Sequence, residues 1–238
     1  MIDHLDVCAQ VRARALTTEV LSVTGSFEAT ATGYARAAGS FLTDGFEVGM
    51  EVSGVGWTNE ENDAPKVVTK VEALLLTTAG VTVDADDDRV LSGTAGTVAE
   101  GPASRTLKVA LPAALQADNE RIVPGQGIPW WREEYSPGSI LRFGVGTTDA
   151  FMQAFIDYFI TLYLPPGGGP RAAHRYASAV LEHFPAGLVV ALGDAETSCR
   201  VRGEPAPFFG QPFQSVEPHP GFFVVPFTVP LELWTVNS

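Results

Sequence analysis

Cysteine and histidine are scarce in this 238-residue chain. The two cysteines, Cys8 and Cys199, are too isolated for a disulfide framework or a cysteine-rich zinc site, so we expect free, mostly buried thiols. The four histidines are scattered without a paired ligand spacing; they are His4, His174, His183 and His219. The sequence therefore predicts no metal site and no other cofactor.

Basic residues are outnumbered by acidic ones. The chain holds 15 Lys and Arg against 28 Asp and Glu, which gives a formal net charge of −13. A surface that grips nucleic acid needs clustered Lys and Arg, so we expect no such surface. An acidic wall repels phosphate, and it therefore suits a conduit through which DNA slides without sticking.

Long hydrophobic runs without charge are also missing. No window of membrane-spanning length is free of charged residues. The N-terminal stretch carries Asp3, Asp6, Arg12 and Arg14 and has no apolar signal core. We therefore expect a protein without a membrane segment, made and kept in a cytoplasm.

The usual motifs of enzymes are absent. There is no GxSxG sequence, and the glycines 167–169 are followed by Pro170, which has no N–H to offer a phosphate. Glu133 and Glu134 are neighbours that face opposite ways on a strand, so they cannot act as a paired acid and base. The acidic stretch 84–88 lacks the glycine and the distal glutamate of a calcium loop, which favours a solvated hairpin turn. We expect no enzyme.

Two segments have the pattern of amphipathic helices. Residues 3–17 place Leu5, Cys8, Ala9 and Leu16 on one side. Residues 170–184 begin with a proline that is suited to a first helical turn and then repeat apolar side chains at helical spacing. These side chains are Ala173, Tyr176, Ala177, Val180, Leu181 and Phe184. A short apolar strand is expected at 188–192.

Most of the remaining chain has strand patterns. Residues 19–98 are rich in Val, Thr, Gly and Ala and are broken by turn clusters, which predicts five to seven short strands in a small barrel or sandwich. Residues 151–164 alternate between a continuous apolar face and a mixed face, and their Phe, Ile, Tyr and Thr content favours a long strand over a helix.

The C-terminal stretch 221–234 predicts an edge strand. Pro226 and Pro230 lie at the same parity, so their missing N–H groups fall along one side of the strand, which cannot pair in a regular ladder. The preceding Pro- and Phe-rich segment is expected to be an extended arm that displays Phe208, Phe209 and Phe213. Exposed aromatic side chains on a long arm usually contact a partner.

The adjacent tryptophans Trp130 and Trp131 have two interpretations. They could stack on a sugar or a base, but neighbours on a strand point to opposite faces and form no flat platform. We favour the other interpretation, in which one tryptophan packs in the core and the other, Trp131, faces a partner.

The segments from Arg105 onward resemble those of the tail terminator (tail completion) proteins of long-tailed bacteriophages. The stretch QGIPWWREEYSPGS, the stretch from LRFGVGT to LEHFPAG and the late strand GFFVVPFTVPLELW follow the order of that family. The family has an N-terminal helix, an extended strand that ends in a proline-glycine turn, two strands, a glycine-rich loop, a helix and closing strands. Residues 1–18 and 99–238 fit this pattern. Residues 19–98 replace a compact link and look like an inserted β-domain.

The resemblance implies an α+β fold, a mostly antiparallel sheet packed by one or two helices, with the inserted small all-β domain beside it. It also implies a structural virion protein, assembled in the host cytoplasm, that forms a homohexameric ring. Such a ring caps the tail tube, ends its polymerisation and docks the head or neck connector, while DNA passes through its lumen without specific binding.

The expected interface residues combine the mixed strand face with the aromatic arm. They are Trp131, Phe155, Phe159, Phe208, Phe209 and Phe213. Two alternatives remain open from the sequence. A head-to-tail connector or other neck protein would share the ring and the acidic lumen, and a carbohydrate-binding virion protein would use Trp130 and Trp131.

Overall fold

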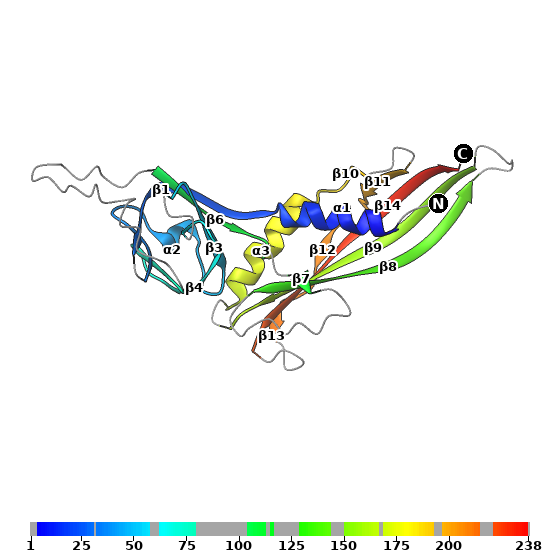
Figure 1. Cartoon of the computed structure of the whole chain (residues 1–238). Coiled ribbons are helices and arrows are strands. Elements are labelled where there is room, and N and C mark those ends of the chain that lie inside the picture. The colour runs from blue at the N-terminus through cyan, green and yellow to red at the C-terminus, as the bar shows by residue number, and fades with distance from the viewer. Residues whose placement is uncertain are drawn as a thin grey trace, which may run out of the picture.

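The structure is a computed structural model. It describes residues 4–30, 32–57, 62–79, 104–112, 115–116, 129–143, 150–166, 169–192, 197–214 and 221–237. The acidic stretch 84–88 and the glycines 167–168, which the sequence analysis considered, lie outside these residues. The fold is mostly antiparallel β, with few helices. A closed barrel lies at one end and a long sheet at the other, with one helix next to the barrel and a second alongside the sheet (Figure 1).

A closed six-stranded barrel forms the N-terminal part of the fold, in the strand order β1-β2-β5-β4-β3-β6. Its strands are β1 (Glu19–Thr30), β2 (Gly33–Arg36), β3 (Glu51–Val55), β4 (Lys66–Val71), β5 (Leu75–Thr78) and β6 (Ser104–Ala110). The expected barrel or sandwich is thus a barrel. It extends past residue 98, because β6 pairs with both β1 and β3 and closes it.

The barrel interior is aromatic, and the cation of Arg105 is buried among the rings. Phe27 and Phe41 stack at 5.7 Å between ring centroids, and Phe41 belongs to the short helix α2 (Phe41–Asp44). The Arg105 guanidinium lies 4.2 Å from the Trp57 ring and donates a 2.9 Å hydrogen bond to the Phe27 carbonyl. A cation over an indole face is attracted by the ring quadrupole, so the buried charge is compensated inside the barrel.

The C-terminal part is a sheet in the order β10-β11-β14-β9-β8-β7, with β12 and β13 also paired to β14. Its strands are β7 (Leu115–Gln116), β8 (Trp130–Phe143), β9 (Ala150–Leu164), β10 (Val189–Val190), β11 (Thr197–Val201), β12 (Phe208–Phe209), β13 (Phe213–Gln214) and β14 (Phe223–Asn237). All pairs are antiparallel except β7 with β8.

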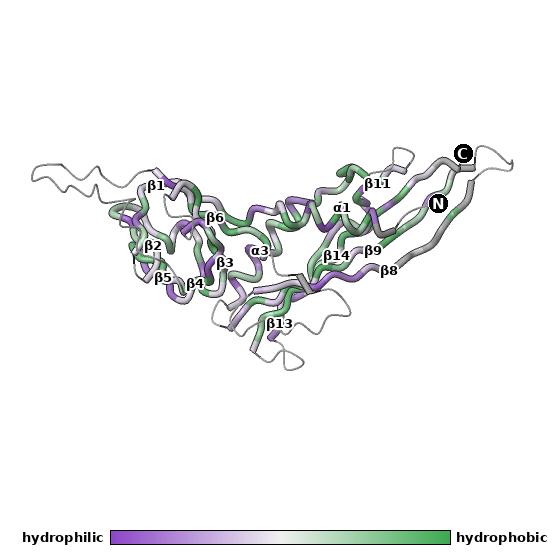
Figure 2. Tube along the Cα trace, in the orientation of Figure 1, coloured by the Kyte–Doolittle hydropathy of each residue, from purple (hydrophilic) through white to green (hydrophobic). Residues whose placement is uncertain are grey.

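The strand predicted at 151–164 is confirmed as β9, which pairs with β14 without a register shift. Its two faces differ as the alternation predicts. Ile156, Tyr158 and Ile160 are buried, whereas Phe155 and Phe159 on the other face are only half-buried. Figure 2 shows hydrophobic residues along both β9 and β14.

Strand β14 is an internal strand, and the expectation of an edge strand is wrong. Its second side pairs with three short strands in succession, β11, β12 and β13. The prolines explain the interruptions. The carbonyls of Pro230 and Pro226 accept hydrogen bonds from Arg202 N and Gly210 N on this side, so the missing N–H groups face it too and break the neighbouring strand into pieces.

Strand β8 continues through the expected proline-glycine turn. The register against β9 shifts between Pro137 and Ile140, which is the signature of a β-bulge rather than a chain reversal. Gly138 fits there because a Cβ at this position would lie only 2.6 Å from the carbonyl oxygen of Phe155. The close backbone approach therefore requires glycine.

Both predicted long helices are present, as α1 (His4–Leu16) and α3 (Gly169–His183). The buried face of α3 is the predicted one, apart from Leu181, which is half-buried. In α1 the prediction was wrong in part, because Ala9 and Leu16 are exposed. The buried side chains of α1 are Val7, Cys8, Val11 and Ala15.

Helix α1 is attached to the sheet by a polar cluster as well as by packing. The Glu133 carboxylate accepts hydrogen bonds from the Arg12 guanidinium and from the Tyr158 hydroxyl. Burial, with the Glu133 charge nearby, raises the pKa of the neighbouring Cys8 thiol to about 11. The Glu133 carboxylate is thus paired at the boundary of the core, where an unpaired carboxylate would be costly.

The barrel lies directly against α3 and the end of β9. Tyr176, which is fully buried in α3, lies beside Glu51 of β3, and burial raises the pKa of its hydroxyl. The Gly45 backbone lies against the Arg175 guanidinium, and a Cβ at Gly49 would lie 3.1 Å from Pro165 Cγ. These contacts place the barrel next to the sheet (Figure 1).

We predict that Glu133→Gln lowers the free energy of unfolding by about 1–3 kcal/mol, because it weakens the ion pair with Arg12 in a partly buried site. Glu134→Gln is the matched control, since the Glu134 side chain is half exposed and pairs with Arg132 at the surface. The control should change stability by less than about 0.5 kcal/mol. Equal losses in urea unfolding would contradict this role of Glu133.

A second prediction concerns pH. Burial, together with the charge of Arg14, lowers the pKa of His183 below its usual 6.5. The unfolded chain therefore takes up this proton first as the pH falls. The stability contributed by neutral His183 is present above about pH 6.5 and is lost as the pH falls toward its folded pKa. Thermal unfolding between pH 7.5 and 5.5 should show a smaller pH dependence for His183→Gln than for the wild type.

Candidate interaction surface

One face of the sheet is partly exposed: Phe155 and Phe159 on it are half-buried, whereas Trp130 and Val224 on the same face are buried. The core residues of α1 and α3 pack with Ile156 and Leu231 on the other face. We call the partly exposed side the outer face. Its side chains come from alternate positions of β8, β9, β11 and β14, and they include Glu134, Phe155, Phe159, Arg200, Thr228 and Trp234.

The outer face mixes aromatic rings with polar pairs. Arg202 forms an ion pair of 2.6 Å with Asp157, and its guanidinium lies 5.2 Å from the Phe155 ring. The Gln153 amide donates a hydrogen bond to the Glu232 carboxylate. A half-exposed aromatic surface with a few charged pairs resembles a protein interface more than an ordinary solvated face.

The segment 205–214, which we call the aromatic arm, adds exposed phenylalanines to the same face. Phe208 lies opposite Thr228 and Phe213 opposite Val224, and these two phenylalanines are 50% and 53% exposed. Phe209 points the other way. It packs on the core, with ring centroids 5.9 Å from His174 and 6.5 Å from Phe227.

The tryptophan pair differs from the expectation. Trp131 is fully buried, and its indole N–H donates a 2.9 Å hydrogen bond to the Pro112 carbonyl. Trp130 is also buried and stacks on Tyr163 at 3.8 Å. Both side chains therefore pack within the subunit, and neither offers a platform to a sugar or a partner.

The structure thus brings four of the six expected interface residues to one face. Phe155 and Phe159 are half-buried on the outer face, and Phe208 and Phe213 stand exposed beside them. The other two, Trp131 and Phe209, point into the core. Strand parity explains the separation, because Phe208 and Phe209 are neighbours and must face opposite sides.

Two adjoining hollows on the outer face were missed by the sequence analysis. They share Arg200 and Glu232, and they are flanked by Gln153, Phe155, Val189 and Trp234. We call them together the Arg200 groove. The alternation of the strand could have indicated Arg200, because it is an exposed position between the buried residues Cys199 and Val201.

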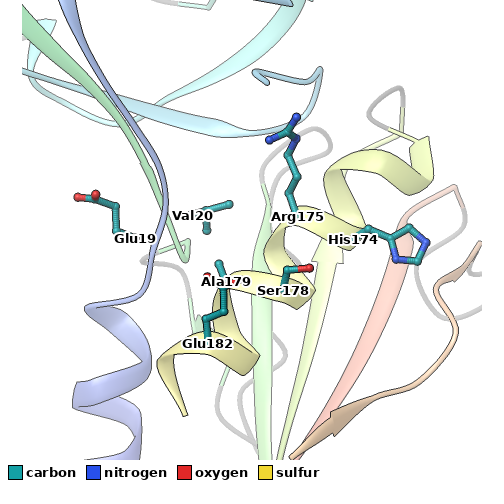
Figure 3. Close-up of a pocket in the computed structure, with 7 residues that line it drawn as sticks. All are labelled: Glu19, Val20, His174, Arg175, Ser178, Ala179 and Glu182. Atoms are coloured by element: carbon teal, nitrogen blue, oxygen red, sulfur yellow. The ribbon is translucent and has the colours of Figure 1, made fainter. Parts of the chain in front are cut away.

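A third hollow lies between the start of β1 and the exposed side of α3. It is lined by Glu19, Val20, His174, Arg175, Ser178, Ala179 and Glu182. In Figure 3 the polar side chains diverge, with Arg175 directed toward the barrel and His174 away from it. They do not converge on a common point as ligand-binding groups would.

The described residues show little that could support chemistry. They contain no group of three or more His, Cys, Asp or Glu side chains that could hold a metal ion. Burial raises the pKa of Cys199 to about 12, and the Cys8 thiol is similarly protected. Both thiols are therefore protonated and unreactive near neutral pH.

No helix among the described residues is long and apolar enough to cross a membrane.

Comparison with protein families supplies the decisive observation. The family described as phage tail terminator protein matches residues 101–230, which is more than half of the chain. The chain belongs to the phage tail terminator family. This confirms the resemblance read from the sequence, and it makes the protein a structural component of the tail of a phage virion.

Two other comparisons add little to the terminator assignment. A search of curated proteins found no match. A solved structure without a descriptive name is similar, with 23% identity over 54% of this chain and 81% of the other, and a TM-score of 0.37. A similarity at this level carries no argument about the fold or the function.

We predict that Phe209→Ser lowers the free energy of unfolding by about 2–4 kcal/mol, because it removes a ring packed against the core of this terminator. Phe208→Ser is the control at the adjacent position, where the ring is half exposed, and it should cost less than about 1 kcal/mol. Thermal or urea unfolding of the two variants measures the difference. A larger loss for Phe208→Ser would contradict the assignment of faces.

Proposed function

We propose that this chain forms a homohexameric ring that caps the tail tube, ends its polymerisation and presents a docking surface to the head or neck connector. The proposal rests on membership of the tail terminator family. The observation that supports self-assembly is the outer face, a long sheet surface that carries exposed aromatic side chains.

The interface of this ring would use the outer face and the aromatic arm. Phe155, Phe159, Phe208 and Phe213 are the residues that we place in it. Exposed aromatic side chains are the groups that protein interfaces most often bury. Trp131 and Phe209 are left out because they already pack within the subunit.

The fold is organised for this role as an α+β ring-forming domain with an inserted barrel. Residues 1–18 and the chain after the barrel would form the ring, and the barrel would decorate it. Insertion between helix α1 and the sheet costs little, because β1 and β6 lie side by side and bring the two ends of the insert together.

The charge of the chain supports passage of DNA without retention. A net charge of −13 in each subunit gives a ring that repels phosphate. DNA would then move through the lumen without a specific binding site, while the tail tube and the connector are held at the two ends of the ring.

The proposed function is tested by the mass of the purified chain, measured by light scattering with and without purified tail tubes. We expect rings of six subunits in solution, or rings that form at tube ends and block further addition of tube protein. A monomer that ignores tube ends would contradict the proposal. Rings that bind only the connector would indicate a neck protein instead.

A further inference from the structure

The Arg200 groove has the chemistry of a site for an aromatic ring. The structure records no ion pair or hydrogen bond for the Arg200 side chain within the described residues, and this side chain is exposed. Its neighbour Arg202 already lies over Phe155. A guanidinium in a partly apolar hollow is complementary to the face of a phenyl ring.

The walls of the groove are suited to such a ring. Val189 is 60% exposed and Trp234 is 38% exposed, which is unusual for side chains of this size. The two hollows that form the groove have volumes of about 510 Å³ and 430 Å³, enough for a phenyl ring each. Glu204 and Glu232 also line the groove, so an acidic occupant would be repelled. An aromatic ring can pack between the Arg200 guanidinium and the apolar side chains of Val189 and Trp234.

The chain itself displays two such rings, on the aromatic arm. Phe208 and Phe213 are the phenylalanines that stand half exposed in the described part of the chain. They lie on the same outer face as Trp234, because Thr228, Val224 and Trp234 share one parity on β14. Phe208, Phe213 and the Arg200 groove therefore lie on the same face of the sheet.

An arm that stays paired with β14 is held away from the groove of its own subunit. Strand β12 holds Phe208 opposite Thr228, whereas the groove lies at Glu232 and Trp234. Four residues of extended strand separate Thr228 from Glu232, the nearer end of the groove, which corresponds to about 13 Å. Releasing the arm would break its pairing with β14. An aromatic ring that occupies the groove while the arm stays paired would therefore come from another copy.

We propose that the aromatic arm of one subunit inserts Phe208 and Phe213 into the Arg200 groove of the next subunit. This inference rests on the proposed ring and specifies how its subunits join. The two surfaces are different parts of the chain, so the contact is head-to-tail. Head-to-tail contacts between identical subunits generate a closed ring when the rotation closes.

Photo-crosslinking tests the contact directly. Benzoylphenylalanine in place of Phe208 should crosslink assembled subunits to one another, and mass spectrometry should locate the products at residues 187–189, 198–204 or 232–234. Benzoylphenylalanine in place of Leu42, which is exposed on the barrel, is the control and should not give these products. Assembled rings whose Phe208 products lie elsewhere, or on tube protein, would overturn the inference.

A mixing experiment tests the head-to-tail arrangement. The double variant Phe208→Ser with Phe213→Ser keeps an intact groove, and Val189→Ser with Arg200→Ser keeps an intact arm. Each variant alone should lose assembly about tenfold or more, because the substituted side chains form the centre of the contact. A mixture of the two has one intact contact and should give two-subunit complexes without rings.

The outcomes separate the inference from the proposed function. If both variants, with unfolding curves like that of the wild type, still form rings, the arm contact is wrong while the terminator ring stands. The arm contact would also be wrong if the wild type forms rings but the mixture of the two variants forms no two-subunit complexes. If the wild type forms no rings even on tail tubes, the proposed function fails first.

Discussion

The pairing of β9 with β14 is the interaction on which the rest of the sheet depends. It joins two fifteen-residue strands in one unbroken antiparallel register. One face of this pair supplies the core against which α1 and α3 pack, and the other supplies the outer face. Because side chains alternate along both strands, a slip of one residue would exchange the two faces and remove both the core and the interaction surface.

The prolines of β14 link this ladder to the surfaces that we propose for assembly. Pro226 and Pro230 leave the β9 side intact and interrupt the opposite side, so that three short strands replace one long partner. The interruptions place the aromatic arm beside one part of β14 and the Arg200 groove beside another. A regular neighbouring strand would leave no room for the aromatic arm or for the Arg200 groove. The spacing of the two prolines therefore determines where the arm and the groove lie.

Much of the fold could be predicted from local patterns. The period of two in β9 and the helical period in α3 are strong because one face of each is buried. The edge-strand prediction for β14 failed because proline excludes regular pairing but not three short partners. The burial of Trp131 and the exposure of Arg200 could not be predicted, because both depend on strands that are distant in the sequence. Parity shows which residues of a strand share a face, but it does not show which face is covered.

A cryo-electron microscopy reconstruction of the assembled rings tests the central claim most directly, since it shows which surface joins the subunits. We expect the outer face of each subunit, with Phe155 and Arg200, to be covered by the arm of its neighbour. A ring in which this face is solvent-exposed, and in which subunits meet through the barrel or through the α1 and α3 side, would contradict the account.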